Sequence, residues 1–378
     1  MLFWLYQIGR RSSICEIKGK YKMIKKISKV LRMFTFLLVL MLLMIIVTNI
    51  FVPTYVQWRW DSDSTTNSFY ELEKDTVDVL VVGPSVSAAA INPMELYKKQ
   101  GICSYNLSII HEPMIGTYYW LKEACETQNP KLVVVEIQIG ARKNPKKEER
   151  FRLCYDYMRF GKNKIEMAQK YCEYDDEANI VEYLFPMTMF HDRWKEFTEL
   201  NYIENKSSTR GFNALVRTYK KGFDGTDMSS EDMPEQYSEI DYEYLEKTIK
   251  FCQEQKMEVL LLRTPDPTWT VEKHNVIERC AEKYDVSFLD CNEKSTFEKI
   301  GIDWKVDGND SQHLNYHGAS KFTKYLGEYL TDNYELEDHR GEKEEEKLGY
   351  DFEGYKRYMD NSKELEKQIK AGKQLWKE

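Results

Sequence analysis

The sequence lacks several patterns that would point to particular classes of protein. Its eight cysteines form no Cys-x-x-Cys pair and show no metal-ligand spacing, so we expect neither a metal site nor a cofactor. Cys103, Cys125, Cys252 and Cys291 lie in apolar or helical patterns, which favours small buried thiols. Pairing of some cysteines in an oxidising compartment stays open. No internal repeat is present.

Positive charge is scarce beyond the N-terminal segment. Residues 1–33 hold nine Lys or Arg and a single acid, Glu16, and so carry +8. The rest of the chain therefore carries −16, for a net charge of −8. A body this acidic lacks the basic stripe that binds a phosphate backbone, so we expect no nucleic-acid partner.

One long apolar run follows the basic segment. From Met33 to Val52 about twenty residues pass without a charge, enough for a helix to span a bilayer. The run has basic residues before it and an acidic stretch after it, so the positive-inside rule places the N-terminus in the cytoplasm. No small-residue cleavage site follows, which favours a retained anchor over a removed signal peptide. We expect a basic cytoplasmic segment over 1–32, a single transmembrane helix over 33–52 in the cell membrane, and a polar stalk over 53–74. Either Met1 or Met23 can be the first residue of the translated protein.

Beyond this stalk, short apolar runs alternate with amphipathic stretches. Residues 77–83 read VDVLVVG, a continuous run typical of a strand that is covered on both faces. Strand and helix alternation predicts a parallel sheet, because parallel neighbours need crossover connections. We therefore expect a three-layer α/β/α domain over 75–330 with a mostly parallel, flavodoxin-like sheet. The expected strands are 77–83, 104–109, 131–139, 258–262 and 286–291, and the expected helices are 115–128, 237–256, 270–284 and 315–330.

Two segments depart from this alternation. Residues 140–235 are charged and aromatic, which predicts a helical insertion or lid. Within it, His191, Arg193 and Trp194 either contact a sugar or an anionic polymer, or pack an amphipathic helix. In 331–378, 24 of 48 residues are Asp, Glu, Lys or Arg, which predicts a solvated helix or a disordered tail.

Ser85 is the first candidate for chemistry. It comes directly after the buried strand 77–83 and directly before a helix, in the sequence VVGPSVSAAA. Ligands of α/β sheets bind at the carboxyl ends of the strands, so this turn lies at the functional edge. Backbone N–H groups at a helix N-terminus stabilise developing negative charge there. Serine is also a favoured helix cap, so the turn alone leaves a structural role equally open.

The sequence DSQHLNYHG supplies the groups that would activate such a serine. Asp310 and His313 stand three residues apart, just before a helix, and can lie on the same side of a turn. Asp310 would accept the proton of one ring nitrogen, leaving the other nitrogen to face a serine hydroxyl. A hydroxyl of ordinary pKa needs a base that is itself oriented, so Ser85, His313 and Asp310 together predict a nucleophile, a base and an orienting acid.

These two motifs resemble those of the SGNH (GDSL-like) hydrolase superfamily. A strand ending in Gly-x-Ser, with Asp-x-x-His-Leu-Asn-x-x-Gly far downstream, is similar to the first and last blocks of that family. The resemblance covers about residues 75–140 and 240–330. It is greatest to the membrane-anchored branch of the alginate O-acetylation proteins and the D-alanyl transfer protein of teichoic acid modification. It implies that Ser85, Asp310 and His313 form a catalytic triad.

The chain departs from the family at the oxyanion hole. The family's Gly-Asp-Ser or Gly-Ser-Ser is Gly-Pro-Ser here, and Pro84 has no backbone N–H to donate. The second block has serine where relatives often have glycine, and the third strand is not followed by Gly-x-Asn-Asp. Asn106 is the candidate substitute donor, with a capped strand end as its alternative. His111, in the loop after the second strand, either lines the pocket or is polar surface, and Arg263 and Trp269 follow the fourth strand.

We expect an extracytoplasmic, membrane-anchored serine esterase or O-acyltransferase. The resemblance implies a cell-surface glycopolymer or another acyl ester as substrate, and a membrane-bound acyl donor as a further possible partner. Hydrolysis and transfer run through the same acyl-enzyme, so the sequence does not separate them. The alternative is a non-catalytic module of the same fold that binds a cell-surface polymer or a membrane partner.

Overall fold

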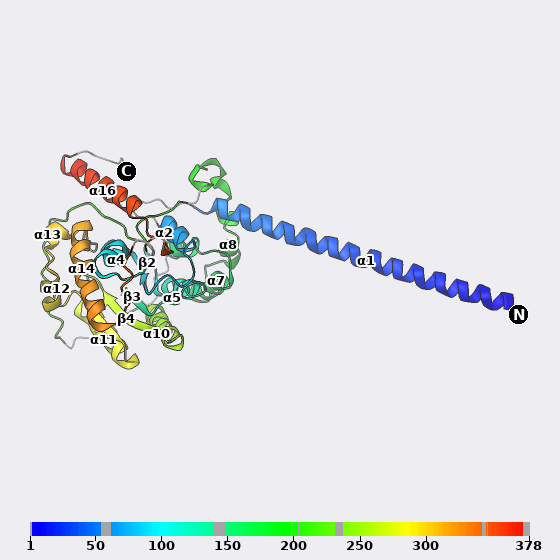
Figure 1. Ribbon diagram of the computed structural model, residues 1–378, viewed down its shortest axis with the longest axis horizontal. Helices are drawn as coiled ribbons and strands as arrows, with labels where there is room; N and C mark the ends of the chain where they lie inside the picture. Colours follow the sequence, from blue (N-terminus) through cyan, green and yellow to red (C-terminus); the bar gives the residue numbers. More distant parts are fainter. Residues whose placement is uncertain are drawn as a thin grey trace. The chain divides into compact units, whose positions relative to one another are not determined.

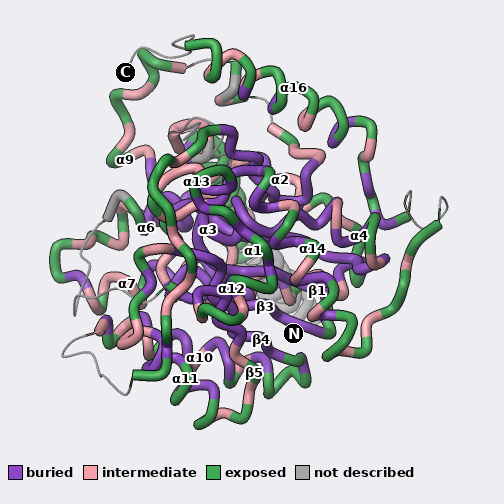
Figure 2. Tube along the Cα trace, turned by 90° about the vertical axis from the view of Figure 1, so that its left-hand side faces the viewer, coloured by how far each residue is buried: buried purple, intermediate pink, exposed green. Residues whose placement is uncertain are grey.

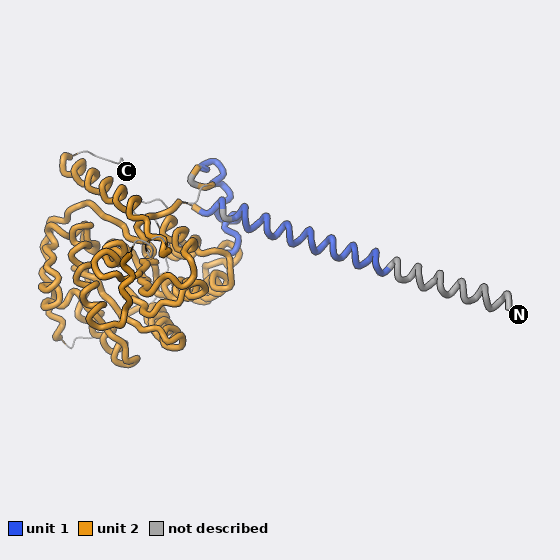
Figure 3. The backbone as a smooth tube through the Cα atoms, in the orientation of Figure 1, with its two compact units in different colours: residues 1–52, 184–197 blue, residues 53–183, 198–378 orange. Residues whose placement is uncertain are grey.

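A computed structural model describes residues 2–53, 62–138, 148–197, 199–202, 205–230, 237–341, 345 and 347–372 of the chain. The chain divides into two compact units, which Figure 3 colours separately. One unit holds residues 1–52 and 184–197, and the other, which we call the body, holds residues 53–183 and 198–378.

The body is built on one five-stranded sheet. All of its strand pairs are parallel, and the strand order is β2-β1-β3-β4-β5. The strands are β1 Val79–Gly83, β2 Ser104–Ser108, β3 Leu132–Glu136, β4 Glu258–Arg263 and β5 Ser287–Asp290. The predicted parallel α/β fold is therefore confirmed, with each strand within a few residues of its expected place.

Helices cover both faces of the sheet. Side chains of a strand alternate between its faces, so Leu80 and Val82 pack into one apolar core whereas Val79 and Val81 pack into another. In Figure 1 the strands lie between α14 and α4 on one side and α5 and α10 on the other, and Figure 2 shows the buried residues gathered on the strands. The first core is closed by α5 Met114–Ala124, α10 Glu239–Glu254 and α11 Val271–Tyr284, and the second by α3 Ser85–Ala90, α4 Pro93–Gln100, α12 Lys294–Ile300, α13 Trp304–Asp307 and α14 Tyr316–Asn333.

The expected insertion is helical only in its first part. Its described residues form α6 Glu148–Tyr155, α7 Lys162–Tyr174, α8 Ile180–Leu184, α9 Met187–Phe190 and two 3₁₀ turns, η1 His191–Lys195 and η2 Glu199–Asn201. Residues 205–230 contain no helix or named strand and run across the body as an extended strap. The strap is fixed by backbone hydrogen bonds from Asn106 N to Arg210 O (3.0 Å), from Tyr316 N to Leu215 O (2.9 Å) and from Thr226 N to Asn292 O (2.7 Å).

The expected stalk over 53–74 is wrong for its described part. Residues Ser62–Phe69 form helix α2, and Phe69 is 1% exposed in the core of the body. Thr66 Oγ1 donates to Ser62 O at 3.0 Å, whereas Ser68 Oγ donates to Ser207 O at 3.3 Å and Ser62 Oγ accepts from Ile110 N at 3.3 Å. Polar composition therefore coincides here with a buried helix, because its hydroxyl groups bond both to the helix's own backbone and to distant segments.

The described part of the tail over 331–378 follows the helical one of its two predicted alternatives, and one face of the helix contacts the body. Helix α16, Phe352–Lys370, docks on the body through Tyr355, whose hydroxyl accepts a hydrogen bond from Asn92 Nδ2 at 2.7 Å. Glu366 accepts a 2.5 Å hydrogen bond from the hydroxyl of Tyr316 at the start of α14. The charged sequence is therefore an ordered helix with one face held against the body.

The other unit is dominated by α1, which runs from Leu2 to Phe51 as one helix. Its residues Met23–Thr48 have a hydropathy of 2.8 and are apolar enough to cross a membrane. The helix thus includes both the basic segment and the apolar run, which the sequence analysis predicts as two separate segments.

Candidate active site

Ser85 is placed at the carboxyl edge of the sheet by the turn between β1 and α3. Strand β1 lies between β2 and β3 and is buried along its whole length. Gly83 ends the strand with φ +144°, and a Cβ there would lie 2.7 Å from the carbonyl oxygen of Glu136. Only glycine fits this close approach to β3. Pro84 then caps α3, and Ser85 is the first residue of that helix.

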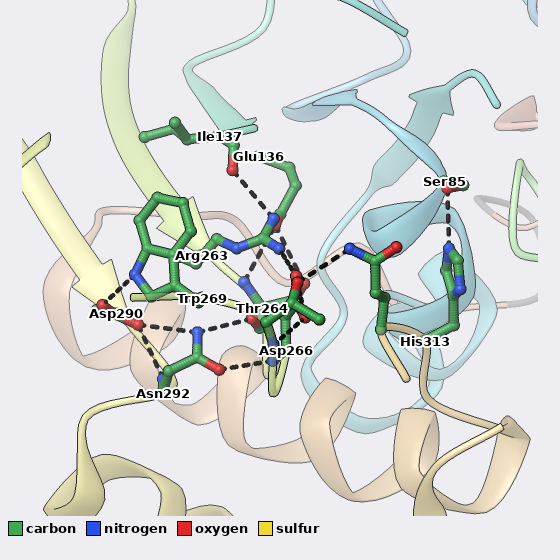
Figure 4. Close-up of polar contacts among 12 residues, drawn as sticks. Ser85, Glu136, Ile137, Arg263, Thr264, Asp266, Trp269, Asp290, Asn292 and His313 are labelled. Atoms are coloured by element: carbon green, nitrogen blue, oxygen red, sulfur yellow. Dashed lines mark hydrogen bonds and ion pairs between the residues drawn. The ribbon is translucent and has the colours of Figure 1, made fainter. Parts of the chain in front are cut away.

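Ser85, His313 and Asp310 form one hydrogen-bonded cluster, as the sequence predicts. Ser85 Oγ lies 2.9 Å from His313 Nε2, although 228 residues separate the two in the chain (Figure 4). On the other side of the ring, His313 Nδ1 lies 2.9 Å from Asp310 Oδ1 and 3.0 Å from Oδ2. The side chain of His313 is 17% exposed, so the cluster is reachable from solvent at its imidazole. This order of groups can activate a serine hydroxyl.

The carboxylate of Asp310 is fixed by its own loop. Its Oδ1 accepts from the backbone N–H groups of Gln312 (2.9 Å) and His313 (3.0 Å), and its Oδ2 accepts from Asn309 Nδ2 (2.9 Å). Burial alone would raise the pKa of Asp310, but the hydrogen bonds and the charge of His313 together hold it below its ordinary value. The carboxylate therefore stays ionised and can stabilise an imidazolium.

Asn309 is a site residue that the sequence analysis missed. Its Oδ1 accepts from the backbone N–H of Arg217 in the strap at 2.9 Å, and its backbone N–H donates to His313 O at 2.8 Å. Asn315 caps α14 and also donates to Arg217 O at 3.1 Å. The strap thus holds the loop that carries the acid and the base. A polar residue beside the Asp-x-x-His motif is the only sequence signal for this role.

Asn106 is not directed at Ser85. It is fully buried, and its Nδ2 donates to two carbonyl oxygens around α3, Ser87 O at 2.9 Å and Ile91 O at 3.0 Å. Both amide hydrogens are therefore used to hold the helix that begins with the nucleophile. Asn106 lies in the middle of β2 and caps no strand end, so its observed contacts match neither predicted role; its Oδ1 is buried with no hydrogen-bond partner among the described residues.

A cavity of about 340 Å³ is connected to the cluster through Gln312, although Ser85, Asp310 and His313 are not among its lining residues. Gln312, the residue before His313, lines it and donates to Thr268 Oγ1, which lines it too, at 3.0 Å. His111 lines the same cavity from the loop after β2, in the left-handed conformation with φ +55°. His111 is thus brought to the pocket, as one of its two readings anticipates. The wall is mixed, and its aromatic and aliphatic part consists of Pro113, Ile115, Phe151, Tyr171, Tyr174, Ile240 and Trp269.

Charged groups line the inner end of this cavity. Burial, followed by the neighbouring Arg263, lowers the pKa of Lys273. Burial raises the pKa of Glu112 well above its usual range, although Ile109 N donates to its Oε2 at 3.0 Å. The cavity therefore offers the polar side chains of Lys273, Glu112 and Gln312 beside its aromatic and aliphatic residues.

A buried ion-pair network supports the inner wall of the cavity, next to the cluster (Figure 4). Arg263 is 1% exposed and donates to Glu136 Oε1 at 2.8 Å, to Ile137 O at 3.0 Å and to Asp266. Burial raises the pKa of Glu136 to about 7, against the opposing effect of Arg263. The guanidinium also lies over the Trp269 ring, 4.9 Å from its centroid. Arg263 and Trp269 reach the cavity wall as part of this network.

The remaining candidates have another partner in the body or belong to the other unit. His317 pairs with Glu366 of α16, with Nε2 and Oε1 3.2 Å apart. His191, Arg193 and Trp194 belong to the unit of α1 rather than to the body. Among the described residues, no group of three His, Cys, Asp or Glu side chains is arranged to hold a metal ion.

No protein-family model and no curated protein matches this chain. Solved structures similar to it include a predicted acylhydrolase from Bacteroides fragilis, at 10% identity, covering 73% of this chain and 98% of that chain, with a TM-score of 0.35. A GDSL-like lipase from Bacteroides thetaiotaomicron is similar at 9% identity, covering 67% and 87%, with a TM-score of 0.33. A predicted GDSL-like lipase from Parabacteroides merdae is similar at 12% identity, covering 68% and 97%, with a TM-score of 0.32. Likenesses this distant carry no argument about activity, which is argued from the site itself.

Proposed function

We propose that the protein is a serine hydrolase or acyltransferase of the SGNH type. The observation that carries the proposal is the unbroken chain of hydrogen-bond distances from Ser85 Oγ through His313 to Asp310. The three residues come from the two motifs that resemble the family. Nothing in the packing of the sheet requires a serine, a histidine and an aspartate to meet at its carboxyl edge.

The mechanism follows from the positions of the atoms. Ser85 Oγ attacks an ester carbonyl while His313 Nε2 takes the hydroxyl proton, and Asp310 stabilises the resulting imidazolium. The N–H groups in the first turn of α3 are the nearest donors for the oxyanion. His313 then returns the proton to the leaving alkoxide, which leaves the acyl group on Ser85. Water or a sugar hydroxyl, deprotonated by His313, attacks the acyl-enzyme and releases the serine.

The 340 Å³ cavity is the candidate site for the group next to the scissile bond. Its aromatic wall suits a sugar ring or a short acyl chain, and Gln312, Lys273 and His111 supply polar contacts. We propose a cell-surface glycopolymer as the substrate or acceptor. In the case of transfer, a membrane-bound donor would supply the acyl group. The support for this proposal is the apolar length of α1, which would tether the body at the outer side of the membrane.

Labelling with a fluorophosphonate probe tests this proposal. The full-length protein in nanodiscs is compared with Ser85→Ala, His313→Ala and the control His317→Ala, which removes a neighbouring histidine that faces Glu366. We expect labelling of the wild type and of the control, and none of the other two. A folded wild type that does not react would refute the hydrolase and favour a polymer-binding module. If labelling succeeds, release of acetate from an O-acetylated polysaccharide, with and without an added sugar acceptor, separates hydrolysis from transfer.

A further inference from the structure

A segment from the middle of the chain belongs to the same compact unit as α1. Residues 184–197 are joined with residues 1–52 in this unit, although Arg193 and Phe51, which touch, lie 142 positions apart (Figure 3). We call residues 186–197, which read PMTMFHDRWKEF, the return segment. It consists of α9, η1 and the residues that flank them.

The return segment caps the carboxyl end of α1. Arg193 Nη1 donates to Phe51 O at 2.6 Å, and the rings of Phe51 and Phe197 meet edge to face with centroids 5.0 Å apart. The last carbonyl groups of a helix have no partner within the helix, and a cation there also complements the helix dipole. The end at which α1 leaves its apolar run is therefore closed by the return segment.

The return segment carries apolar side chains that the unit does not bury. Trp194 is 62% exposed and Met189 is 41% exposed. The other tryptophans whose side chains the structure describes, Trp120, Trp269 and Trp304, are at most 4% exposed. An exposed tryptophan beside exposed methionine is unusual for a water-facing surface, and is typical of the aromatic belt where a protein meets a membrane–water interface.

The last turns of α1 are also exposed up to the point where the return segment meets the helix at Phe51. Ile46 is 59% exposed and Val47 is 37% exposed, whereas Thr48, one residue on, is 4% exposed. The charges of the return segment balance, since Arg193 and Lys195 are matched by Asp192 and Glu196. A balanced segment has no net attraction for an anionic polymer, which makes the lipid boundary the better partner.

We infer that the return segment lies in the outer membrane–water interface and forms a second contact of the chain with the lipid surface. This inference rests on the proposed insertion of α1 in a membrane. Trp194 and Met189 face the boundary between headgroups and acyl chains, while Arg193 holds the segment to the end of α1. It does not depend on whether Ser85 is catalytic.

Tryptophan quenching in the full-length protein tests the inference. Nanodiscs are made with ordinary or brominated phosphatidylcholine, and the signal of Trp194 is obtained as the difference between wild type and Trp194→Phe. In the Trp194→Phe background, Leu40→Trp reports the middle of α1, and Phe160→Trp reports an exposed position on the body, since Leu40 and Phe160 are 45% and 43% exposed.

We expect brominated lipid to quench most of the Trp194 and Leu40→Trp signals and to leave the Phe160→Trp signal, which aqueous acrylamide quenches instead. Quenching of Leu40→Trp with Trp194 reached only by acrylamide would overturn the inference and leave the anchor intact. Protection of Trp194 from both quenchers would overturn the inference, because it would show that protein rather than lipid covers Trp194. Absence of quenching at Leu40→Trp would refute the anchor, and the inference with it.

Discussion

The role of Asp310 can be tested by replacing only its charge, in Asp310→Asn. Two backbone N–H groups, from Gln312 and His313, hold Oδ1, so the amide oxygen of the new side chain will take that position. The NH₂ group of the new side chain then takes the place of Oδ2. In the wild type this Oδ2 accepts a hydrogen bond from Asn309 Nδ2 at 2.9 Å, so the NH₂ group faces another donor. Asn309 cannot turn to accept from it, because its own oxygen accepts from Arg217 N.

The substitution therefore removes the negative charge beside the imidazolium and sets two donors against each other. We expect the rate of acylation to fall about 10³- to 10⁴-fold, which corresponds to about 4–5.5 kcal/mol in the barrier. The loop keeps both backbone hydrogen bonds to Oδ1, so the protein should still fold, with a melting temperature lowered by the opposed donors and the lost charge.

The assay is the second-order rate constant of fluorophosphonate labelling in nanodiscs. Ser85→Ala sets the background. Asp285→Asn is the matched control, because Asp285 is exposed at the end of α11 and its left-handed backbone, φ +52°, suits asparagine equally. A labelling rate for Asp310→Asn within about threefold of wild type, less than 1 kcal/mol in the barrier, would show that Asp310 does not support His313.

Further predictions concern the frame around the site. Gly83→Ala should destabilise the fold by about 2–4 kcal/mol, because its Cβ would meet Glu136 O at 2.7 Å; an unchanged melting temperature would contradict this. Arg263→Met leaves buried carboxylates without their cation and should cost about 3–5 kcal/mol by denaturant titration, more at pH 8 than at pH 5, where the carboxyl groups can take up protons. Because the pKa of Glu136 is raised to about 7, its contribution to stability is fully present below the unfolded value of 4.5 and is lost as the pH rises through 7. Glu136→Gln should flatten melting temperature against pH over that window, and an unaltered profile would refute the assignment. The seven cysteines that the structure describes are free, so dithiothreitol should leave the melting temperature of the protein as it is, and a drop would reveal a disulfide.

The sheet and the Ser–His–Asp cluster could be predicted because their signals are local. Each strand is a continuous apolar run, and β1 leads directly to Ser85. The Asp-x-x-His spacing places Asp310 and His313 in one turn, where their side chains meet at 2.9 Å. Short-range patterns of this kind survive folding because neighbouring residues of a turn stay neighbours in space.

The parts that could not be predicted depend on distant partners. Asn309 acts through the backbone N–H of Arg217, which leaves no trace in the side-chain sequence. The helix α2 is polar in composition, and its burial depends on β2 and on the strap. The tail looked solvated because residues 342–347 are charged, whereas Tyr355 and Glu366 beyond them find partners on α4 and α14. In each case a pairing far away in the chain decides the outcome.

The 228 residues between nucleophile and base have a consequence for biosynthesis. A chain made at about 5–20 residues per second needs about 10–45 s to add His313 after Ser85 has been made. On the proposed function, the nascent protein carries during that interval a serine with no base, which could not react with esters at the membrane surface. The strap also precedes His313 in the chain, so the binding surface for its loop is made first. Reactivity is thereby delayed until almost the whole body has been synthesised.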